Sequence, residues 1–129
     1  MADDIAPVRR ILVVEDAPVI ALDVQEMLEG LGWTVVGPIG NLGVALELAA
    51  QEPLDAALID INIRGGKIYP VARILAVGEI PFLLASGYAN KGLPDDLVDR
   101  PRLEKPYNAA DLGARLDELI ARTPAREVG

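Results

Sequence analysis

Carboxylate, hydroxyl and ammonium side chains follow the short apolar runs of this sequence. The candidate site residues are Glu15, Asp16, Asp60, Ser86 and Lys105. Three carboxylates that converge on one place repel one another, and a divalent cation removes this conflict. Mg²⁺ suits the role because it takes one or two carboxylates, keeps several waters and accepts phosphate oxygens. With a lysine charge and a hydroxyl donor added, the set predicts phosphoryl transfer, in which Asp60 is the nucleophile.

Short segments rich in apolar residues must position these residues, and they predict β-strands at 11–14, 33–36, 56–59 and 80–85. Residues 102–104, which are not an apolar run, are a candidate for a short fifth strand. Continuous apolar runs of this length are typical of strands that are buried on both faces. Amphipathic stretches between and after them predict helices, which begin near Pro18, Asn41, Ile68, Asn90 and Asp111. This alternation predicts an α/β fold with a mainly parallel sheet, and such sheets bind ligands beyond the carboxyl ends of their strands.

Proline, asparagine and glycine mark several boundaries of these elements. Pro18 can occupy the first turn of a helix, and Asn41 can cap the next one. Gly37–Gly43 has the wrong glycine spacing for a dinucleotide-binding loop, so we expect a turn before the second helix. The helical pattern at 90–98 is weak because a glycine and a proline interrupt it.

The composition excludes several classes of protein. The 129 residues include no cysteine and no histidine, so disulfides, thiol nucleophiles, imidazole triads and histidine-ligated metals are absent. A net charge of −8 disfavours nucleic acid as a partner. The sequence has neither a membrane-length apolar run nor a signal peptide, so we expect a soluble cytoplasmic protein.

Over nearly its full length the chain resembles the receiver domain of two-component response regulators. The matching residues are Glu15-Asp16, Asp60, Ser86-Gly87 and Lys105-Pro106, each after a predicted strand. The resemblance implies a doubly wound, flavodoxin-like sheet of five parallel strands in the order 2-1-3-4-5. It implies a receiver domain at 8–122, between flexible termini at 1–7 and 123–129. Because the chain ends soon after the last helix, we expect no output domain.

The resemblance also implies a role for each acidic residue. Asp16 would bind Mg²⁺ directly and Glu15 through water, and Asp60 would be both a metal ligand and the phosphoacceptor. Asn62 occupies the position at which a backbone carbonyl joins the metal in this family.

Other positions resemble the family's switch. Ser86 matches the switch hydroxyl, and Lys105 matches the lysine that pairs with the phosphate. Three residues before Lys105, the family usually has an aromatic residue that moves inward on activation, but here it is Arg102. An inward arginine would bury a charge. We therefore expect Tyr88, or a rearranged segment at 90–98, to take part of the switch role.

Pro81–Tyr88 is similar to the PFxFATGY signature of a receiver subgroup found mainly in alphaproteobacteria. Leu84 replaces an aromatic residue of that signature, and Ser86 replaces a threonine while keeping the hydroxyl. Members of the subgroup often work with histidine kinases of the HWE type. The resemblance thus implies a histidine kinase or phosphotransfer protein as donor and a downstream protein as target, with no membrane partner. We expect a monomer or a weak dimer.

Two other functions remain open. A haloacid-dehalogenase-type phosphatase also forms an aspartyl phosphate, but it needs an acid two residues after the nucleophile, where this chain has Asn62. A flavodoxin-like ligand-binding domain is the second alternative, although clustered acids disfavour a phosphate-bearing cofactor. The polar face of the last helix is ordinarily solvated, and a docking role there also stays open.

Overall fold

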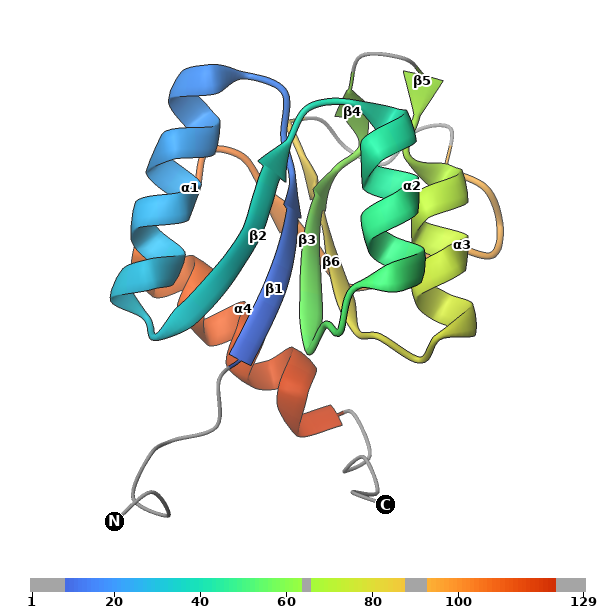
Figure 1. The fold of residues 1–129 in the computed structure, drawn as a ribbon. Helices are drawn as coiled ribbons and strands as arrows, with labels where there is room; N and C mark the ends of the chain where they lie inside the picture. Colours follow the sequence, from blue (N-terminus) through green and yellow to red (C-terminus); the bar gives the residue numbers. More distant parts are fainter. Residues whose placement is uncertain (1–8, 64–65, 88–92, 123–129) are drawn as a thin grey trace, which may run out of the picture.

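The computed structural model describes residues 9–63, 66–87 and 93–122, without the side chains of Asn62 and Arg122. A single layer of parallel strands runs through the middle of the molecule, with helices on both sides (Figure 1). The strands are β1 (Arg9–Val14), β2 (Trp33–Ile39), β3 (Ala56–Asp60), β6 (Phe82–Ser86) and β7 (Arg102–Glu104). The helices are α1 (Pro18–Gly30), α2 (Leu42–Gln51), α3 (Tyr69–Val77) and α4 (Ala109–Arg122).

The order of the strands is β2-β1-β3-β6-β7, and all pairings are parallel. Counted along this sheet alone, the order is 2-1-3-4-5, which confirms the predicted flavodoxin-like topology. A separate two-stranded hairpin, β4 (Asn62–Ile63) and β5 (Gly66–Lys67), follows β3. This hairpin was not predicted from the sequence, because its strands are too short to show any periodicity.

Two apolar clusters, one on each face of the sheet, form the core. In β1, Ile11 and Val13 belong to the cluster beneath α1 and α4, whereas Leu12 and Val14 belong to the cluster beneath α2 and α3. Successive side chains of a strand point to opposite faces, so a strand covered on both faces has to be apolar throughout. This requirement explains the continuous runs in the sequence. Among the described residues, no helix has the length and apolarity needed to cross a membrane.

Several local predictions are confirmed. α1 begins at Pro18, and Asn41 caps α2 because its Oδ1 atom accepts a hydrogen bond of 3.0 Å from the backbone N–H of Val44. Ahead of α4, Asn108 Oδ1 accepts from the N–H of Asp111 at 2.8 Å, which the sequence analysis did not foresee. Side-chain caps of this kind satisfy backbone donors that have no partner inside the helix.

Two local predictions are wrong. Gly37 and Pro38 do not form a turn but continue β2 as far as Ile39, which an edge strand tolerates because one side of its backbone needs no partner. Within the described part of the predicted helix at 90–98, residues 95–98 form turns instead. The N–H of Leu97 donates to the carbonyl of Pro94 at 2.9 Å, a tight bond between residues three apart.

Candidate functional site

The register of the central strands brings the acidic residues together. Val14 of β1 is paired with Ile59 of β3, so the next residues along each chain, Glu15 and Asp60, emerge side by side. Both are buried, with only 5% and 9% of their surfaces exposed. Strand ends at the carboxyl edge of the sheet therefore place two carboxylates where little water reaches them.

The neighbouring strands bring Ser86 and Lys105 to the same edge. Ser86 ends β6 and is paired with Glu104, the last residue of β7. The backbone N–H of Lys105 donates to the carbonyl of Ser86 at 2.8 Å, which fixes the chain at the point where the lysine leaves the sheet.

The ammonium group of Lys105 joins the two buried carboxylates. Its Nζ atom lies 2.8 Å from Oε1 of Glu15 and 2.7 Å from Oδ2 of Asp60. The other oxygen of Glu15 accepts a hydrogen bond of 3.2 Å from the N–H of Ala17, at the start of α1. Short charge-assisted bonds such as those of Lys105 are about twice as strong as neutral ones.

One cation between two carboxylates leaves an excess of negative charge. Burial raises the pKa of Glu15, and the hydrogen bond from Lys105 offsets this effect only in part. Burial alone would lower the pKa of Lys105, but its bonds to Asp60 and Glu15 raise it. The two shifts differ in cause: desolvation dominates for Glu15, whereas for Lys105 the bonds to two carboxylates together outweigh desolvation.

A third carboxylate, that of Asp16, completes an acidic group. Glu15, Asp16 and Asp60 each offer an oxygen within 4.8 Å of the others. Ligand oxygens bound to one Mg²⁺ lie about 2.1 Å from the ion and so at most about 4.2 Å apart. The donor set therefore fits a hard divalent cation after a small adjustment, or with one acid reached through water.

Gly40 positions Asp16 from the loop after β2. A Cβ atom on Gly40 would lie 3.1 Å from the Cα and 3.2 Å from the Cβ of Asp16. The N–H of Glu15 donates to the carbonyl of Ile39 at 2.9 Å, so the two loops are also tied together. A side chain at Gly40 would have to push the acidic pair away. Sequence reasoning missed this role, because the close approach of two loops leaves no local signal.

Tyr107 is a second neighbour that sequence reasoning missed. It packs against the cluster beneath α1 and α4, and with Glu15 and Asp60 it lines a small void below the site. Burial raises the pKa of Tyr107 to about 12, from an ordinary value of 10.0 at which the phenol is already protonated at neutral pH. Its place two residues after Lys105 is the signal that could have indicated it.

The structure describes the remaining predicted site residues only in part. Arg102 is half-buried in β7, and its guanidinium donates to the carbonyl of Val98 at 3.3 Å. The charge of Arg102, whose burial the sequence put in question, thus has the carbonyl of Val98 as a hydrogen-bond partner. Tyr88 lies outside the described residues, as does the side chain of Asn62, although the backbone of Asn62 belongs to β4.

Known proteins with similar sequences match most of the length of this chain. No family model matches it. It is 29% identical over 127 residues to the transcriptional regulatory protein PdtaR of Mycobacterium tuberculosis, covering 92% of this chain and 60% of PdtaR. The chain thus spans only about 60% of the length of that curated relative.

Solved structures match the fold more completely. SdrG of Sphingomonas melonis is 36% identical with a TM-score of 0.78, and the match covers 90% of this chain and 99% of SdrG. The receiver domain of the sensor histidine kinase PA1611 of Pseudomonas aeruginosa, solved with magnesium in its active-site cleft, has a TM-score of 0.79 at 24% identity. That match covers 89% of this chain and 99% of the receiver domain. Given this likeness and the acids gathered at the strand ends, the chain belongs to the receiver-domain family of response regulators.

Proposed function

We propose that Asp60 accepts a phosphoryl group from a phosphohistidine, carried by a histidine kinase or a phosphotransfer protein in the cytoplasm. The observation that carries this proposal is the shared lysine: Nζ of Lys105 lies within 2.8 Å of both Asp60 and Glu15 at the carboxyl ends of the central strands. The arrangement combines a carboxylate nucleophile with a fixed positive charge, as phosphoryl transfer requires.

In the reaction an oxygen of Asp60 forms a bond to phosphorus while the bond between phosphorus and the imidazole nitrogen breaks. The nitrogen keeps the bonding electron pair, and the donor histidine is released. Lys105 can then exchange its contact with Asp60 for one with a phosphoryl oxygen, and the hydroxyl of Ser86 can donate to another. When it is held by Glu15, Asp16 and Asp60, Mg²⁺ supplies positive charge against the phosphoryl oxygens.

The chain would act as a signalling switch and not as an enzyme for other substrates. It would catalyse only its own phosphorylation and dephosphorylation, and the phosphorylated form would bind a target protein or relay the phosphate. Asn62 stands where a related phosphatase needs an acid. The likeness to the PFxFATGY signature favours a donor kinase of the HWE type. SdrG has been solved in a BeF₃-activated conformation, which supports a comparable activated state here.

Phosphorylation can be tested by intact-protein mass spectrometry after incubation with acetyl phosphate or a phosphorylated kinase. We expect the wild type to gain one phosphoryl group when Mg²⁺ is present and none when it is chelated. Asp60→Asn should gain none, whereas Asp117→Asn, an exposed change on α4, should behave as the wild type. Transfer to Asp60→Asn at an unchanged rate would refute the assignment.

A further inference from the structure

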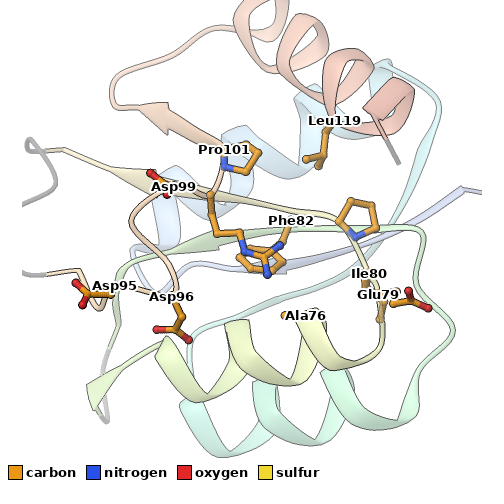
Figure 2. Close-up of a pocket in the computed structure, with 11 residues that line it drawn as sticks. Ala76, Glu79, Ile80, Phe82, Asp95, Asp96, Asp99, Pro101 and Leu119 are labelled. Carbon is orange, nitrogen blue, oxygen red and sulfur yellow. The ribbon is translucent and has the colours of Figure 1, made fainter. Parts of the chain in front are cut away.

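A pocket of about 570 Å³ lies between α3, α4 and residues 95–101 (Figure 2). It is lined by Phe82 at the start of β6, whereas Ser86 of the candidate site is at the end of that strand. Strand residues rise about 3.3 Å each, so some 13 Å separate the two positions. Pockets that bind ligands have volumes of roughly 300–1,000 Å³. This pocket has a suitable size and is separate from the phosphoacceptor.

The rim of the pocket is acidic. Figure 2 shows Asp95, Asp96 and Asp99 on one side, and Glu79 apart from them at the end of α3. Asp96 forms an ion pair of 3.0 Å with Arg73. Within the described ranges, no salt bridge joins the other three carboxylates to a cation. Glu79 also adopts a φ of 58°, a conformation in which glycine is less strained.

Apolar side chains line the pocket between the acids, and local contacts hold its shape. The guanidinium of Arg100 lies 5.1 Å from the ring centroid of Phe82 and covers this buried ring. Leu97 is fully buried, and the Arg73–Asp96 pair ties the rim to α3. The pocket therefore exists without a ligand, and the positive charge of Arg100 balances only part of the acidic rim.

Charge decides which occupant fits. The chain has a net charge of −8, so a second copy would be repelled, and so would nucleotides and nucleic acids. Carboxylates on separate sides of an apolar pocket instead complement a cationic chain that lies across it. We propose that this pocket binds an extended basic segment of a partner protein, with an arginine or lysine at each end and an apolar side chain between them.

The proposal can be tested by NMR titration of the ¹⁵N-labelled protein with a capped pentapeptide of sequence arginine–glycine–leucine–glycine–arginine. Excess Mg²⁺ is added so that the acidic group at Asp60 does not attract the peptide. We expect the largest shifts in the amides of Ala76, Phe82 and residues 95–100. Affinity should fall as salt is added, because the rim charges are exposed.

Paired variants separate a specific site from general attraction to an acidic protein. Asp95→Asn with Asp99→Asn should weaken binding roughly fivefold, in line with the modest strength of exposed ion pairs. Asp23→Asn with Glu26→Gln removes the same charge from α1 and should leave the affinity unchanged. The proposal is overturned if both double variants lose affinity equally, or if the glutamine analogue of the peptide binds as well. Because the test uses unphosphorylated protein, it does not depend on the reaction at Asp60.

Discussion

At the residue scale, the decisive feature is that Lys105 forms ion pairs with two acids, Glu15 and Asp60, at once. From the sequence, Glu15 and Asp60 could be placed near each other because both follow buried parallel strands. The sequence also marked Lys105 as a partner for phosphate. It could not show that the lysine bridges the two carboxylates in the resting protein, because that contact depends on rotamers and depth within the fold.

Replacing Lys105 with methionine should therefore destabilise the protein. The change leaves Glu15 and Asp60 close together without their cation, which we expect to lower the free energy of unfolding by about 2 kcal/mol near neutral pH, allowing for partial exposure of the lysine. The pKa of Glu15 is already raised, so the loss should shrink as pH falls and Glu15 takes up a proton.

Urea unfolding of both proteins at neutral and acidic pH, without and with Mg²⁺, measures this effect. Below the ordinary pKa of Lys105, 10.5, the lysine is charged in both the folded and the unfolded state, so its own titration changes nothing between neutral and acidic pH. Its own titration removes the stabilisation only as pH rises through the raised pKa, and the change expected on acidification comes from Glu15. A loss of stability that is independent of pH would contradict the electrostatic explanation.

At the element scale, strands were easier to predict than the loops that join them. Apolar runs, the proline in the first turn of α1 and the cap at Asn41 are local signals, so these elements were found. Gly37 and Pro38 favour a turn locally, yet they continue β2 because that strand is at the edge of the sheet. Edge position is a property of the assembled sheet, and no stretch of sequence encodes it alone.

The loop after β2 carries a prediction of its own. Gly40→Ala should weaken Mg²⁺ binding roughly tenfold, as expected for a group that supports a metal ligand. The added methyl group meets the backbone of Asp16, which cannot move without shifting its carboxylate. Isothermal titration calorimetry measures the affinity. Gly30→Ala is the matched control because an added Cβ there has nothing within 4 Å. Equal Mg²⁺ affinities for the wild type and Gly40→Ala would show that the loop can move aside without disturbing the metal site.

At the scale of the whole molecule, the sequence predicted the architecture but not the pocket beside α3. The parallel sheet with helices on both faces follows from alternating strands and helices, whereas its strand order was implied by the resemblance to receiver domains. The pocket is lined by residues from α3, β6, α4 and the turns at 95–99, so no motif marks it. The turns themselves were expected to be a helix, which would have given the acids a different arrangement.

Metal binding should stabilise the entire fold, because the acids that would hold the ion come together only in the folded chain. At a Mg²⁺ concentration roughly 100-fold above the dissociation constant, the free energy of unfolding should rise by about 2.7 kcal/mol. Thermal or urea unfolding with increasing Mg²⁺ measures the rise. Asp16→Asn should abolish most of it, while a wild type insensitive to Mg²⁺ would argue against a metal site.

The position of Lys105 has a consequence for the speed of transfer. Only 19% of its side-chain surface is exposed, and its amine already contacts two oxygens. A phosphoryl oxygen that arrives would replace a carboxylate oxygen and not a shell of water molecules. Most of the water around this amine is therefore removed when the protein folds, before the reaction begins. Little rearrangement of the surroundings is then left to slow the transfer of the phosphoryl group.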